Sequence, residues 1–244
     1  MPRLDQMTQG AVQGFSFSGA RPERLGASEY TLATIVVDVT GSVGGFEQGL
    51  RACALSAIGA CRHSPRSENI LVRLVAFNES PREIFGFTPL SDIDDAMVSL
   101  PDPRGGTALI DAIYAAASAS NAYGKMLADQ DYLVNAVSFV ITDGDDTCSK
   151  MSVAMARAEV IAGSSAEYID SAQVALIGIN AARFASTLTD LAKQLGLVGY
   201  IDAGDASESA LAQVARFISA SVSSASQSLG TGAGSSIGLA VAAP

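Results

Sequence analysis

Runs of largely apolar residues alternate along the chain with segments in which apolar residues recur at helical spacing. β-branched and other apolar residues without polar alternation are typical of strands buried on both faces of a sheet. The sequence predicts such strands at 34–37, 70–77, 138–143, 173–179 and 198–204. Residues 81–90 follow the second run after a three-residue turn, which is too short for a parallel crossover, so we expect an antiparallel edge strand there.

Helical periodicity fills most of the intervals between these strands. The predicted helices occupy 45–62, 91–100 with Ser91 or Asp92 as its cap, an Ala-rich stretch after 107, 151–162, 181–196 closed by Gly196, and 208–222. This alternation predicts a doubly wound, Rossmann-like α/β fold: a mostly parallel six-stranded sheet with one antiparallel edge strand and helices on both faces. Such sheets bind ligands beyond the carboxyl ends of their strands.

Composition divides the chain into three parts. Residues 1–30 are rich in Gly, Ser, Gln, Arg and Pro and are expected to form an extended arm, in which the alternation around Phe15 and Phe17 is compatible with one added edge strand. Residues 31–220 are expected to form a single domain. Residues 221–244 are rich in Ser, Gly and Ala, which favours a flexible tail.

The first strand ends in a loop that carries a carboxylate and two hydroxyls. Asp38, Thr40 and Ser42 stand at i, i+2 and i+4, and in an extended segment this period points all three side chains the same way. Oxygen ligands of this kind suit a hard divalent cation. Two later stretches add matching groups: GGTALIDAI at 105–113, and SFVITDGDDT at 138–147, where a second apolar strand ends in an Asp.

These three motifs together resemble the von Willebrand factor A (VWA) family, and more particularly its prokaryotic intracellular members. The resemblance implies a metal-ion-dependent adhesion site (MIDAS), with Asp38, Thr40, Ser42, Thr107 and Asp143 as ligands of Mg²⁺, or of Mn²⁺ or Ca²⁺. Thr40 departs from the family pattern, which usually has Ser there, but it keeps the hydroxyl ligand.

The resemblance also implies a function without catalysis. A protein partner would donate an Asp or Glu to the open position of the cation. Bacterial proteins of this type are associated with AAA+ ATPases, as adaptors, and with stress or conflict systems. Two alternatives stay open. One is a structural protein that assembles with itself through the arm and tail.

The other alternative is a haloacid-dehalogenase-like phosphotransferase with Asp38 as its nucleophile. That family has a second Asp where this chain has Thr40. It also needs a suitably placed lysine, and the lysines here are Lys125, Lys150 and Lys193.

Charge and composition exclude several other classes. The net charge of −10, from 25 acidic and 15 basic side chains, argues against nucleic-acid binding and favours cations or basic partner surfaces. The N-terminus lacks the apolar core of a secretory signal and no apolar run is long enough to span a bilayer, so we expect a cytoplasmic protein that does not bind membranes.

Other reactive residues have simpler explanations. Cys53, Cys61 and Cys148 lack disulfide or zinc spacing and are expected to be reduced thiols, the first two in core packing. The single histidine, His63, is expected far from the loop, which argues against a catalytic triad. Asp111 is expected outside the first coordination shell, orienting a water or a loop, whereas Asp145 and Asp146 are expected to be solvated.

Overall fold

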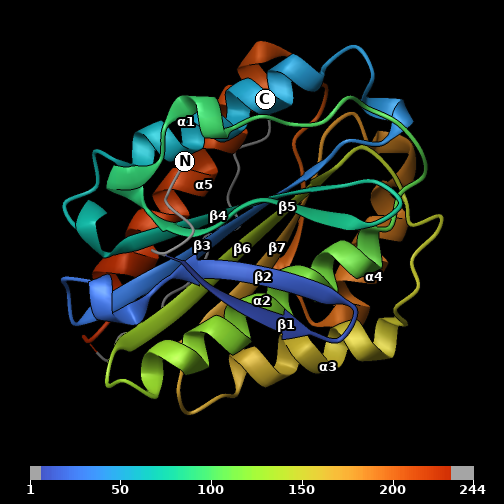
Figure 1. The fold of residues 1–244 in the computed structure, drawn as a ribbon. Coiled ribbons are helices and arrows are strands. Elements are labelled where there is room, and N and C mark those ends of the chain that lie inside the picture. The colour runs from blue at the N-terminus through green and yellow to red at the C-terminus, as the bar shows by residue number, and fades with distance from the viewer. Residues whose placement is uncertain (1–6, 232–244) are drawn as a thin grey trace.

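Eight strands form one sheet in the computed structural model, which describes residues 7–231 (Figure 1). In spatial order they are β1 (Met7–Val12), β2 (Phe15–Ala20), β5 (Pro81–Pro89), β4 (Ile70–Phe77), β3 (Glu29–Asp38), β6 (Leu133–Thr142), β7 (Ala172–Gly178) and β8 (Gly199–Asp202). Strands β4, β3, β6, β7 and β8 run parallel to one another, whereas β5 is antiparallel to β4. The α/β class and the mostly parallel sheet are confirmed.

Helices cover both faces of the sheet, as expected (Figure 1). Helices α1 (Glu47–Cys61) and α5 (Glu208–Ser228) lie on one face, and α2 (Leu109–Ala128), α3 (Val153–Ser164) and α4 (Ala185–Leu195) lie on the other. Gly196 closes α4 with a left-handed φ of 73°. Strand β3 is central, and all its residues from Tyr30 to Asp38 are buried. It therefore delivers Asp38 to the middle of one edge of the core.

The number of strands differs from the expected six because the N-terminal segment forms a hairpin. Strands β1 and β2 pair antiparallel around a tight turn at Gln13 and Gly14, where Gly14 has a φ of 82°. Phe17 is buried, and its ring lies edge-on to that of Tyr123 on α2, with 6.5 Å between centroids. The hairpin is thus stabilised by long-range packing, which the weak alternation of residues 7–12 does not encode.

The expectation that residues 81–90 form an edge strand is also wrong. Strand β2 lies beside β5 in parallel, with Gly19 opposite Phe87. The backbone N–H and the hydroxyl of Ser18 donate to Glu83 at 3.0 and 2.6 Å, and the buried Arg73 donates to the same carboxylate at 2.7 Å. This partly buried ion pair, together with Ser18, joins three strands, and β5 is an interior strand.

Two further segments differ from the predicted elements. Residues 91–100 do not form one helix: there are short 3₁₀ turns at Leu90–Asp92 and Asp95–Met97, the second capped by Asp94, whose carboxylate accepts from the N–H of Ala96 at 2.9 Å. Clustered Asp side chains compete for backbone donors in this way and disfavour a longer helix.

The last helix extends beyond its expected end. Helix α5 continues to Ser228, so residues 221–228 of the expected tail are helical, and residues 232–244 of that tail lie outside the described residues. The division of the chain into arm, domain and tail stays a prediction. Within residues 7–231 no helix is both long and apolar enough to cross a membrane.

Candidate metal centre

The carboxyl ends of β3 and β6 meet at the centre of one edge of the sheet. Val37 lies opposite Ile141, so the next residues along, Asp38 and Thr142, are also neighbours. After β3 the chain makes a 3₁₀ turn at Gly41–Val43, and the N–H of Gly41 donates to the carbonyl of Gly105 at 3.2 Å. The loops after β3, β6 and before α2 are therefore brought together at one place.

Four of the five predicted ligands form one hydrogen-bonded chain there. The Asp38 carboxylate accepts from the Thr40 N–H at 2.8 Å and from the Thr142 hydroxyl at 2.7 Å. The hydroxyls of Thr40 and Ser42 are 3.0 Å apart, and that of Ser42 donates to Asp143 at 2.9 Å. Ser42 lies in the 3₁₀ turn at Gly41–Val43, so its hydroxyl reaches that of Thr40 through a turn and not along the extended segment expected from the i, i+2, i+4 spacing.

Thr107, the fifth predicted ligand, lies on the adjoining loop. It is buried, its N–H donates to the Thr147 hydroxyl at 2.8 Å, and its carbonyl accepts from the Thr147 N–H at 2.8 Å. Within residues 7–231 its own hydroxyl makes no hydrogen bond to the other four side chains. The hydrogen bond between Gly41 and Gly105 nevertheless holds its loop against theirs.

The two carboxylates are poorly compensated by the protein. Asp38 is 0% exposed, and burial raises the pKa of its carboxyl to about 6, with a further contribution from the charge of Asp143. Burial also raises the pKa of Asp143, although the Ser42 hydroxyl and the charge of Arg183 oppose that effect. Neither carboxylate is in an ion pair within the described residues, so the site has a deficit of positive charge.

The chemistry of this donor set fits a hard cation. Two carboxylates and three hydroxyls are oxygen ligands of the kind that Mg²⁺, Mn²⁺ and Ca²⁺ prefer. The described part of the chain contains no group of three or more His, Cys, Asp or Glu side chains placed to hold a metal, so a site built mainly from Cys and His is not found there. Asp38 and Thr40 are buried whereas Ser42 is exposed, so the set is open to solvent on the Ser42 side.

Two side chains that hydrogen-bond at this centre were not identified from the sequence. Thr142 precedes Asp143 in the chain, and only the register between β3 and β6 shows that its hydroxyl meets Asp38. Asp146, expected to be solvated, instead accepts from the N–H of Ile110 in the first turn of α2 at 3.2 Å. The position of Asp146 shortly after a strand places it near the site, but the sequence does not show that its partner is the N–H of Ile110, 36 residues earlier in the chain.

Other reactive groups lie outside this centre. Cys53 and Cys61 are free and buried in the core, as predicted, and burial raises the pKa of each thiol to about 12. Cys148 is a free, exposed thiol in the loop after β6. His63 is exposed, beyond the end of α1, where its ring lies 3.0 Å from the carbonyl of Gly59.

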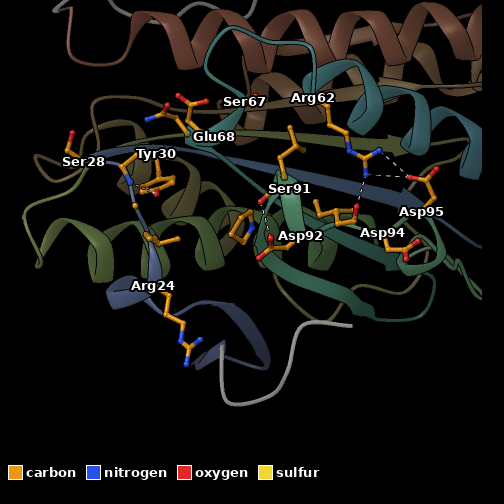
Figure 2. A pocket seen from close by; sticks show the side chains of 17 residues that line it. Arg24, Ser28, Tyr30, Arg62, Ser67, Glu68, Ser91, Asp92, Asp94 and Asp95 are labelled. Carbon is orange, nitrogen blue, oxygen red and sulfur yellow. Dashed lines mark hydrogen bonds and ion pairs between the residues drawn. The ribbon is translucent and has the colours of Figure 1, made fainter.

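A broad hollow of about 1480 Å³ lies at the opposite end of the sheet (Figure 2). Tyr30 and Asn69, near the amino ends of β3 and β4, form part of its wall. Arg62 points into it but is engaged, because it donates to the carbonyl of Ile93 at 2.7 Å and pairs with Asp95 at 3.4 Å (Figure 2). None of the predicted metal ligands lines this hollow.

Comparison with known proteins identifies the class of fold. No protein-family model matches the sequence, and no curated protein sequence does either. The fold, however, is VWA-like: the structure of a von Willebrand factor type A protein from Catenulispora acidiphila matches 89% of this chain, with a TM-score of 0.55 and 14% identity.

Two further solved structures share this fold. The PilB minor pilin from Streptococcus sanguinis matches 84% of this chain, with a TM-score of 0.56 and 17% identity. Proximal thread matrix protein 1 from the mussel byssus, in a form with a zinc-occupied MIDAS motif, matches 82%, with a TM-score of 0.53 and 14% identity.

The present chain spans 64% of the pilin, 46% of the byssus protein and 45% of the Catenulispora protein. These three structures are described as a pilin, a matrix protein and a von Willebrand factor type A protein, none of them as an enzyme. At such identities the likeness establishes the fold alone.

Proposed function

We propose that this chain is a metal-dependent protein-binding module of the MIDAS type. The observation that carries the proposal is the hydrogen-bonded set of the buried Asp38, Thr40 and Asp143 with the exposed Ser42, in which the two carboxylates have no ion-pair partner within the described residues. Together with Thr107 they would hold Mg²⁺, Mn²⁺ or Ca²⁺. A bound cation would offset the charge that burial leaves on the two carboxylates.

The partner is expected to supply an Asp or Glu to the cation. Two protein carboxylates and neutral hydroxyls leave an electrophilic position for an incoming carboxylate on the exposed side marked by Ser42. A hollow of about 360 Å³ beside the site is lined by Asp145, Asp146 and Asp190, so basic residues next to the partner's carboxylate would complement this rim. The zinc-occupied MIDAS of the mussel protein supports use of this fold for metal binding.

The phosphotransferase alternative fits this geometry poorly. A nucleophilic Asp must expose a carboxylate oxygen to a phosphoryl group, which needs far more room than a metal ion, but Asp38 is 0% exposed and both its oxygens accept hydrogen bonds. Two of the three lysines do not supply the missing group, because Lys125 pairs with Asp129 and Lys193 with Asp190 on helix surfaces. The third, Lys150, is exposed in the loop after β6. Association with an AAA+ ATPase, self-assembly and a cytoplasmic location stay predictions from the sequence.

Metal titration tests the proposal directly. Calorimetry with Mg²⁺ and Mn²⁺ is expected to show one site in the wild-type protein and a loss of binding in Asp143→Ala. Asp92→Ala is the matched control, because Asp92 is exposed and belongs to the hollow at the other end of the sheet. Absence of binding by the wild type at millimolar metal, or equal binding by Asp143→Ala, would contradict the proposal.

A further inference from the structure

The loop that follows β6 is fastened to the start of α2 by hydrogen bonds in both directions. The first of these hydrogen bonds involve Thr107, which lies just before α2: its carbonyl accepts from the N–H groups of Thr147 at 2.8 Å and Cys148 at 3.3 Å. Thr147 also accepts from the N–H of Thr107 through its hydroxyl, at 2.8 Å. The Thr107 backbone is therefore fixed to a segment that begins only four residues after Asp143.

Side chains from this loop occupy the free N–H groups of the first turn of α2. The Asp146 carboxylate accepts from Ile110 at 3.2 Å, and the Ser149 hydroxyl accepts from Asp111 at 3.1 Å. The Ser149 hydroxyl donates in turn to Asp146. A helix starts with N–H groups that lack partners within the helix, so these contacts both cap α2 and hold the loop against it.

Asp111 makes the opposite connection, from the helix to the loop. Its carboxylate is 1% exposed and accepts from the backbone N–H groups of Lys150 at 2.9 Å and Met151 at 2.8 Å. Within the described residues it forms no ion pair, so these donors are what compensate its charge. Both donors meet the same carboxylate oxygen, Oδ1, and a buried acceptor of this kind fixes the position of the two N–H groups closely.

We propose that Asp111 is a positioning residue of the metal centre: it holds the 143–151 loop against α2, so that Thr107 and Asp143 face the same point. This inference rests on the proposed function for the identity of the ligands. In the described part of the chain the Asp111 carboxylate hydrogen-bonds to none of the five proposed ligands, and it acts through the backbone of the loop. Residues of this kind, which orient the groups that hold a metal, typically change metal affinity by about 10- to 100-fold when they are replaced.

The test compares Asp111→Ala, Asp111→Asn and the wild type at a temperature at which all three are folded. Asn keeps an oxygen that accepts from the same two N–H groups but has no charge, so it separates positioning from electrostatic attraction. The matched control is Glu83→Gln, which perturbs another carboxylate with several hydrogen bonds, between β2, β4 and β5.

Two measurements are made. Amide hydrogen exchange in EDTA reports on the loop alone, and Mn²⁺ titration reports on the site. In Asp111→Ala we expect exchange in the peptide covering 147–151 to be at least about tenfold faster and Mn²⁺ affinity to fall about tenfold. Asp111→Asn should restore most of both properties, and Glu83→Gln should change neither.

Unchanged loop exchange in Asp111→Ala would overturn the inference whether or not the wild type binds metal. An Asn variant as weak as the Ala variant would also overturn it, because charge would then be the cause. Faster exchange with unaltered Mn²⁺ affinity would overturn the inference, because Asp111 would then hold the loop in place without affecting the metal site. If the wild type binds no metal, the proposed function fails, and so does the claim that Asp111 positions metal ligands. Loop exchange then reports only whether Asp111 holds the 143–151 loop against α2.

Discussion

Asp38 gives the sharpest prediction, because its burial makes the stability of the metal-free protein depend on pH. Burial raises its pKa from 3.8 to about 6. The folded state then holds the proton on Asp38 more tightly than the unfolded state does. The contribution of Asp38 to the free energy of unfolding is therefore greatest below the unfolded pKa. It is lost as the pH rises through about 6.

The magnitude follows from the same two values. At about 1.4 kcal/mol per pKa unit, ionised Asp38 destabilises the metal-free fold by about 3 kcal/mol above pH 7. By linkage, about half of this is restored when the pH is lowered from about 7.5 to 5. For a chain of this size 1 kcal/mol shifts the unfolding midpoint by about 2 to 4 °C, so we expect a rise of about 3 to 6 °C.

The assay is urea and thermal unfolding in EDTA at several pH values between 5 and 8, for the wild type and for Asp38→Asn. Other groups titrate in this range, so the informative quantity is the difference between the two proteins. That difference should vary with pH, whereas the difference between wild type and Asp92→Asn, at an exposed carboxylate, should not. Saturating Mg²⁺ should remove most of the effect at pH 7.5, since a ligand at a hundredfold excess over Kd adds about 2.7 kcal/mol.

One result would refute this reasoning about burial and charge. If wild type and Asp38→Asn differ in stability by the same amount at every pH in EDTA, the Asp38 carboxyl has an ordinary pKa. The buried charge that favours a cation would then be absent. A dependence on pH that persists unchanged in saturating Mg²⁺ would show that the cation does not bind near Asp38.

Three further predictions concern the ligands and the hairpin. Thr40→Ser should keep metal affinity and Thr40→Val should lose it, because Val preserves the shape but lacks the oxygen; equal affinities in a Mn²⁺ titration would remove Thr40 from the ligand set. Asp143→Ala and EDTA should weaken capture of a native partner to a similar degree and should not add, because both remove the same cation; a partner retained by Asp143→Ala in either buffer would place recognition on another face. Arg73→Ala leaves the partly buried Glu83 without its cation and should lower the free energy of unfolding by about 3 kcal/mol, the lower end for a buried pair because Glu83 keeps some exposure, measured in urea, while metal affinity at a temperature where the variant is folded stays unchanged.

The sequence by itself determined the α/β class and most of the predicted ligand cluster. Strand ends and local spacing carry that information: Asp38, Thr40 and Ser42 lie within five residues, and a strand that stops at Asp143 must end at the same edge of a parallel sheet. The structure does bring Asp143 to Ser42, at 2.9 Å. Metal binding by these residues stays a prediction.

Only the tertiary structure decided how distant segments support that cluster. The β1–β2 hairpin is held by hydrogen bonds from Ser18 to Glu83 and by packing of Phe17 on Tyr123, contacts that span 65 residues or more. The alternation around Phe15 and Phe17 indicates a strand but not these partners. The role of Asp146 as a cap of α2, and that of Asp111 as an acceptor for the loop, depend in the same way on which backbone donors the fold leaves free. Local periodicity records which face a residue buries, but hydrogen-bond partners are chosen by the packing of the whole chain.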